Sequence, residues 1–87
     1  RYYNQALIIE VFSNSTAYID RSEKLMAYKR LESLQEYVLS SQDSPVIELY
    51  RSSKDWQGEH IVSGGVLTLE SIGLSIEVDE LYSFLLS

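Results

Sequence analysis

The sequence contains no cysteine, a single proline, and no lysine or arginine after Lys54. The absence of cysteine excludes disulfide bonds and thiolate zinc sites. Because small secreted domains usually depend on such cross-links, we expect a reducing, cytoplasmic environment. No apolar run approaches the roughly 20 residues of a membrane-spanning helix, so we expect no membrane association. With 87 residues, 45% of them hydrophobic, the composition is that of one small globular domain.

The charges are divided unevenly along the chain, whose net charge is −6. Residues 1–54 hold seven basic and seven acidic residues, whereas residues 55–87 hold six acidic residues and no lysine or arginine. Binding to nucleic acid needs a cationic surface, so the acidic residues 55–87 are not expected to contact it. They are typical of a solvated surface with no binding role. Residues 1–54 are neutral and could still face a polyanion.

Hydrophobic patterning predicts a βαβ unit followed by antiparallel strands. The apolar run Ala6–Phe12 is typical of a strand covered on both faces. A helix from Tyr18 or Asp20 to Leu31 leads to a second strand at Gln35–Ser41, and such crossovers join parallel strands. The later elements are expected to be a strand at Val46–Arg51 and a hairpin of residues 56–63 and 66–69 around Gly64-Gly65. Residues 71–77 are expected to be irregular or to form a short extended piece around Gly73. A closing helix is expected at Val78–Leu86, with Asp79 as its cap or first-turn acid. The predicted fold class is α/β with a mixed sheet (α+β).

Glu10 is the one charged residue of the first predicted strand. Alternation along a strand places Ile8 and Phe12 on its face. A carboxylate in the middle of a doubly covered strand is costly unless it is paired or bound to a metal. The alternative is a glutamate near the strand end that forms a salt bridge or reaches solvent, and the strand pattern alone leaves both open.

The predicted helix carries a second polar signal on its apolar side. At 100° per residue, one stripe holds Asp20, Lys24, Ala27, Tyr28 and Leu31. We expect Ala27, Tyr28 and Leu31 to pack on the sheet, so Asp20 and Lys24 should also face it. A simple i,i+4 ion pair explains the pair, but not its place on the apolar stripe.

Glu10, Asp20 and Lys24 are expected to meet at one edge of the sheet. The carboxyl end of a parallel strand and the start of the following helix share the edge where α/β folds bind ligands. A carboxylate that holds Mg²⁺ and a lysine that orients water or stabilises the phosphorane oxygens suit phosphodiester hydrolysis. The metal lowers the pKa of its bound water.

Several segments share their motifs with one known protein family. Residues 9–16, IEVFSNST, are similar to its strand-and-loop motif V-E-V-L-S-P-S-T. Residues 20–24, DRSEK, resemble its D-R-x-x-K helix start. Further similarity covers residues 28–31, 33–39, 72–74 and 79–82 in order, so nearly the whole chain takes part. On these segments the chain resembles the Uma-type family of restriction endonucleases, which belongs to the PD-(D/E)xK nuclease superfamily.

The resemblance implies a restriction-endonuclease-like fold, dependence on Mg²⁺ or Mn²⁺, and DNA as substrate. It assigns metal binding and catalysis to Glu10, catalysis to Lys24, and a supporting role to Asp20. The superfamily's usual lysine follows the acid by two residues, where this chain has Phe12, and the helix supplies Lys24 instead. One further departure is Asn14 in place of proline.

The family's first metal-binding aspartate, in a Pro-Asp motif on an earlier strand, has no counterpart before Ala6. We therefore expect residues 1–87 to be one partial domain, the C-terminal part of a nuclease domain, inactive by itself. A missing N-terminal segment or a homodimer would complete it. The alternatives are a truncated, non-catalytic relative that serves as a dimerisation or partner-binding module, and a nonenzymatic α+β interaction domain that binds no metal.

Overall fold

The computed structural model describes residues 2–12 and 17–86, and the side chains of residues 4–12 and 22–84. A five-stranded sheet in the order β1-β2-β3-β4-β5 forms its centre. Its strands are β1 (Tyr2–Tyr3), β2 (Leu7–Phe12), β3 (Glu36–Ser41), β4 (Val46–Arg51) and β5 (Gly58–Val62). β2 and β3 are parallel and every other neighbouring pair is antiparallel. This confirms the predicted mixed sheet, with β2 in its interior.

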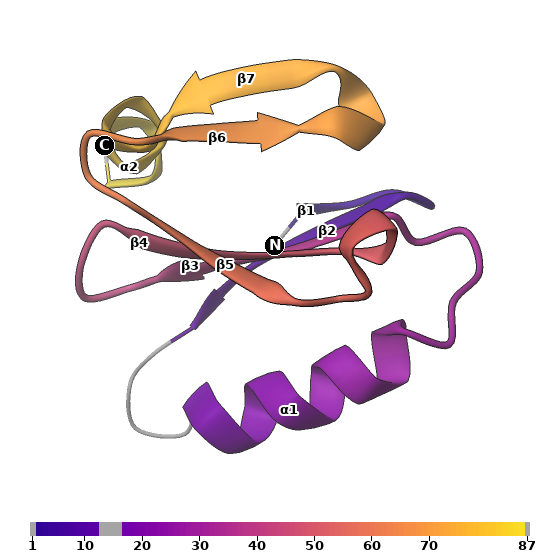
Figure 1. Cartoon of the computed structure of the whole chain (residues 1–87). Coiled ribbons are helices and arrows are strands. Elements are labelled where there is room, and N and C mark those ends of the chain that lie inside the picture. Colours follow the sequence, from indigo (N-terminus) through magenta and orange to yellow (C-terminus); the bar gives the residue numbers. More distant parts are fainter. Residues whose placement is uncertain (1, 13–16, 87) are drawn as a thin grey trace.

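The sheet is the middle of three layers (Figure 1). Helix α1 (Ala17–Tyr28) crosses below one face and connects β2 to β3. The other face is covered by β6 (Val66–Leu69), β7 (Leu74–Glu77) and α2 (Val78–Leu86). Two 3₁₀ turns, η1 (Ser52–Lys54) and η2 (Glu70–Ile72), follow β4 and β6. The predicted closing helix is confirmed at its exact bounds.

Strand alternation divides the apolar side chains between two cores. The core beneath α1 contains Ile8, Leu34, Tyr37 and Leu39, with Phe12, Leu25, Tyr28, Tyr50 and Trp56 packed against it. The core beneath the second layer contains Leu7, Val38, Ile47, Leu49, Leu67, Leu69, Val78 and Tyr82. The shared face predicted for Ile8, Glu10 and Phe12 is therefore the face covered by α1.

Two predicted contacts of α1 are wrong. Ala27 is exposed and Leu31 is 49% exposed, whereas Leu25 and Tyr28 pack against the core. The helix begins at Ala17 and ends at Tyr28, so Leu31 falls in the turn that follows, where its amide donates to the Tyr28 carbonyl. The predicted helix ran to Leu31, and including Leu31 shifted the expected sheet-facing side of the helix towards Ala27.

The predicted hairpin around Gly64-Gly65 is also wrong. β5 pairs with β4, whereas β6 pairs with β7 in a separate two-stranded sheet. Of the two forms predicted for residues 71–77, the short extended piece is the one found, as β7. The chain leaves the main sheet at Gly64, whose φ is +90°. Asp79 accepts hydrogen bonds from Ser63 Oγ (2.6 Å) and the Gly64 amide (3.2 Å), which ties this crossing to α2. Leu67 then packs against the face of the main sheet. β6 therefore covers that sheet and does not pair with β5.

A buried ion pair joins the second layer to the main sheet. Glu36 on β3 is 1% exposed, and its Oε2 lies 3.0 Å from Nε of Arg51 on β4. The Ser71 and Glu70 amides donate to its two carboxylate oxygens at 2.8 and 3.1 Å. Arg51 also donates to the Thr68 carbonyl. Sequence reasoning assigned no role to this pair, which fixes the start of η2 against the sheet.

Candidate active site

Glu10 lies on β2, on the face of the main sheet that α1 covers. It stands opposite Leu39 of the parallel neighbour β3 and is 5% exposed. The Ser40 hydroxyl lies 3.5 Å from its backbone carbonyl, which adds a contact between the two strands. The expectation of a buried strand carboxylate is therefore met.

Among the described residues, the side chains of Lys24, Tyr28 and Tyr37 donate hydrogen bonds to the Glu10 carboxylate. Lys24 Nζ lies 3.0 Å from Oε2, and the Tyr37 hydroxyl lies 3.3 Å from the same atom. The Tyr28 hydroxyl lies 3.2 Å from Oε1. The structure thus brings Glu10 and Lys24 together, 14 residues apart in sequence. The side chain of Asp20, the third predicted member, lies outside the described residues.

Glu10 and its donors Lys24, Tyr28 and Tyr37 form the Glu10 cluster, and Lys24 on α1 is its solvent-exposed member. The Lys24 side chain is 43% exposed, whereas that of Glu10 is 6% exposed. A long, half-exposed lysine can move its ammonium group between the carboxylate and an incoming anion, because its stem has four rotatable bonds. The carboxylate itself is held in place by its surroundings.

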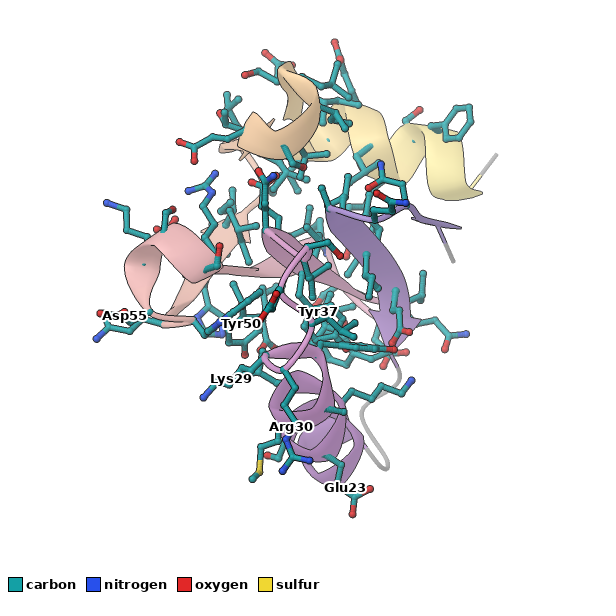
Figure 2. The ribbon with its side chains drawn as sticks, turned by 90° about the vertical axis from the view of Figure 1, so that its right-hand side faces the viewer. Glu23, Lys29, Arg30, Tyr37, Tyr50 and Asp55 are labelled. Carbon is teal, nitrogen blue, oxygen red and sulfur yellow. The ribbon has the colours of Figure 1, made fainter. Side chains whose placement is uncertain are left out.

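Tyr37 is the most enclosed donor of the cluster. It is 0% exposed, its ring meets that of Tyr28 edge-on at 5.0 Å, and it stacks on Tyr50 at 6.1 Å. Figure 2 places Tyr37 and Tyr50 between the sheet and α1. Burial, followed by the negative charge of Glu10, raises the pKa of Tyr37 well above its usual value. The hydroxyl is therefore protonated, and able to donate, at any ordinary pH.

A second buried carboxylate lies on the same face of the sheet. Glu48 on β4 is 4% exposed, stands opposite Leu39, and accepts a 2.6 Å hydrogen bond from the Tyr50 hydroxyl. Sequence reasoning missed Glu48 and the hydrogen-bonding roles of the tyrosines. The signal was available in the two-residue spacing that puts Tyr37 with Leu39, and Glu48 with Tyr50, on one face.

The cluster fits a divalent cation only in part. Within the described residues, no group of three His, Cys, Asp or Glu side chains is placed to hold a metal ion. Among the described residues, Glu10 is the one that offers a hard carboxylate oxygen beside Lys24. Mg²⁺ is commonly held by one or two carboxylates together with waters and substrate phosphates. Glu10 therefore suits the role of one ligand, and the described side chains do not complete the set.

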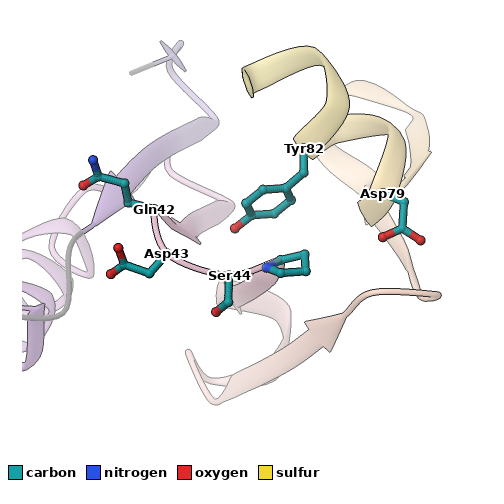
Figure 3. Close-up of a pocket in the computed structure, with 6 residues that line it drawn as sticks. Gln42, Asp43, Ser44, Asp79 and Tyr82 are labelled. Carbon is teal, nitrogen blue, oxygen red and sulfur yellow. The ribbon is translucent and has the colours of Figure 1, made fainter. Parts of the chain in front are cut away.

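A separate pocket of about 260 Å³ opens at the β3–β4 turn, between that turn and α2 (Figure 3). It is lined by Gln42, Asp43, Ser44, Pro45, Asp79 and Tyr82. The Tyr82 hydroxyl donates to the Ser41 and Val46 carbonyls at 2.7 and 3.0 Å. These bonds attach α2 to both ends of the β3–β4 turn. None of the lining residues touches the Glu10 carboxylate in the contacts above. This pocket therefore adds nothing to the Glu10–Lys24 cluster.

Comparison with known proteins matches most of the chain to one protein family. Residues 5–79 match the sequence profile of a family described as "Uma2: Putative restriction endonuclease". The chain is 40% identical over 78 residues to an uncharacterized protein of Synechocystis sp., a match covering 87% of this chain and 41% of that protein. The chain thus spans less than half of that relative. No solved structure matches the chain.

Within the described part of the chain, no helix is long and apolar enough to cross a bilayer.

Proposed function

Because the chain belongs to the Uma2 family of putative restriction endonucleases, we propose that it forms part of a Mg²⁺-dependent DNA endonuclease of the PD-(D/E)xK type. One observation carries the proposal: a strand carboxylate, Glu10, is 5% exposed and lies 3.0 Å from a lysine that is itself half-exposed. A buried carboxylate and a mobile cation together match what phosphodiester hydrolysis requires. The absence of cysteine supports a cytoplasmic setting.

Glu10 and Lys24 have different tasks in this proposal. Glu10 holds the divalent cation through its carboxylate, with Mg²⁺ preferred and Mn²⁺ as a substitute. When bound, the cation supplies an activated water and shields the charge of the scissile phosphate. Lys24 moves its ammonium from Glu10 to the phosphate, where it orients the attacking water or stabilises the oxygens of the transition state. The sequence spacing predicts that Asp20, one helical turn before Lys24, supports the lysine.

The proposed site needs more than these 87 residues. Without a substrate phosphate, the one strand carboxylate found among the described residues would hold Mg²⁺ only weakly. The similar Synechocystis protein is more than twice as long as the matched region. We propose that a segment outside this chain, or a second copy of it, supplies the missing carboxylate. The chain by itself should therefore bind Mn²⁺ weakly and leave DNA uncut.

The test is carried out on the full-length protein that contains this chain. Glu10→Gln should abolish Mg²⁺-dependent nicking of supercoiled plasmid and reduce Mn²⁺ binding. Lys24→Ala should abolish nicking without weakening Mn²⁺ binding, because lysine is not a metal ligand and its ammonium competes with the cation for Oε2 of Glu10. Glu59→Gln is the matched control, since its carboxylate is 48% exposed and lies on the opposite face of the sheet.

The rival is a salt bridge that only stabilises the fold. It predicts that both variants lower the melting temperature while nicking falls only in proportion to the folded fraction. Full nicking by Glu10→Gln at a matched folded fraction contradicts the proposed function.

The alternative function is a non-catalytic module that dimerises or binds a partner. The single carboxylate found at the site among the described residues favours it. A full-length protein that binds no Mn²⁺ and cuts no plasmid, yet forms a stable dimer in light scattering, decides for this alternative.

A further inference from the structure

Glu10 has three donors that differ in freedom of movement. Lys24 is half-exposed, and Tyr28 is partly buried at the end of α1. Tyr37 is completely buried and is clamped between two aromatic rings, edge-on to Tyr28 and stacked on Tyr50. When Lys24 moves from Glu10 to a phosphate, Tyr37 stays hydrogen-bonded to Glu10, because its packed ring has no space in which to move.

Tyr37 and Lys24 share one acceptor atom. Both approach Oε2 of Glu10, at 3.3 and 3.0 Å, whereas Tyr28 approaches Oε1. The Lys24 ammonium therefore already occupies a cation position next to a carboxylate oxygen that Tyr37 holds in place. A divalent cation that replaces the ammonium there meets an oxygen whose direction is fixed.

We propose that Tyr37 is the positioning residue of the site: its buried hydroxyl keeps the Glu10 carboxylate aimed at the place of the Lys24 ammonium, where the divalent cation binds. The inference rests on the proposed function and adds a residue to it. Hydrogen bonds to a metal-binding carboxylate fix its orientation, and losing such a partner typically weakens metal binding about 10- to 100-fold.

Tyr50 offers a matched control on the neighbouring strand. Its ring stacks on Tyr37, but its hydroxyl donates to Glu48 at 2.6 Å. Tyr37→Phe and Tyr50→Phe each remove one buried hydroxyl and keep the ring. Both changes should lower the melting temperature by similar amounts, so a general loosening of the core affects both variants alike.

The experiment measures Mn²⁺ affinity by calorimetry, and plasmid nicking against Mn²⁺ concentration, in the full-length protein. Tyr37→Phe should bind Mn²⁺ about 10-fold or more weakly, and high Mn²⁺ should restore most of its nicking. Tyr50→Phe should bind within about twofold of the unaltered protein. An unchanged affinity in Tyr37→Phe, or equal losses in both variants, overturns the inference while leaving the proposed function standing. An unaltered protein that binds no Mn²⁺ overturns both.

Discussion

Replacing Glu36 with glutamine should destabilise the fold by about 3 kcal/mol at pH 7. Removing one partner of a buried ion pair typically costs about 3–5 kcal/mol, because the other charge stays buried without compensation. Arg51 keeps the Thr68 carbonyl and two more distant carboxylates, Glu70 at 3.5 Å and Glu59 at 3.9 Å, which are 63% and 48% exposed. We therefore expect the lower end of the range. The glutamine carbonyl still accepts one of the two backbone amides of η2.

This loss is large for a chain of 87 residues. At about 0.05–0.15 kcal/mol per residue, the whole fold is stable by about 4–13 kcal/mol. A loss of 1 kcal/mol lowers the melting temperature of such a domain by about 4–8 °C, so Glu36→Gln should melt about 12–24 °C lower. Circular dichroism melting of the chain and the variant measures the difference directly.

The pH dependence of this difference has a definite sign. Burial raises the pKa of Glu36, but hydrogen bonds from Ser71, Arg51 and Glu70 lower it by more, so the net pKa lies below its usual value of 4.5. A depressed folded-state pKa contributes stability that is complete above the unfolded-state pKa and lost as the pH falls through the folded value. The gap between chain and variant should therefore be widest at pH 7 and shrink below about pH 4.5.

The control for this prediction is Glu59→Gln, whose exposed carboxylate should matter by less than about 1 kcal/mol. A Glu36→Gln variant that melts within about 2 °C of the unaltered chain at pH 7 would refute the argument. A gap that is the same at pH 7 and pH 3 would also refute it.

Three further predictions concern the second layer, and urea unfolding tests each of them. Tyr82→Phe should cost about 1–2 kcal/mol, because the Ser41 and Val46 carbonyls lose their common donor; a loss below about 0.3 kcal/mol contradicts this. Gly64→Ala should cost about 1–2 kcal/mol through its φ of +90°, although nothing lies within 4 Å of an added Cβ; an unchanged midpoint counts against it. Phe84→Ser should change stability by less than about 0.5 kcal/mol, because Phe84 is 76% exposed; a larger loss would contradict this.

Local patterns predicted the βαβ unit because each of its elements carries its own signal. The predicted strands at Ala6–Phe12 and Gln35–Ser41 match β2 and β3 within one residue at their ends. The parallel pairing of β2 with β3 followed from the helix between them. Glu10 and Lys24 were brought together by the same reasoning, because a strand end and the following helix must share an edge of the sheet.

The pairing of β6 was not predictable in the same way. Two short strands on either side of two glycines suit a hairpin equally well as a crossing between layers. The choice is made by side chains distant in sequence: Leu67 and Leu69 are buried beside Val38 and Val78 of other elements. Only the assembled core distinguishes a strand that extends the sheet from one that covers it.

Glu36 and Glu10 illustrate why burial alone does not identify a site. Both are buried strand glutamates, each with a cation 3.0 Å away. Glu36 accepts from an arginine that is 11% exposed and from two backbone amides, which cannot leave without unfolding η2. Lys24, the cation beside Glu10, is 43% exposed and is free to exchange the carboxylate for another anion. The mobility of the partner, and not the burial of the acid, therefore makes Glu10 the better candidate for chemistry and assigns Glu36 to the fold.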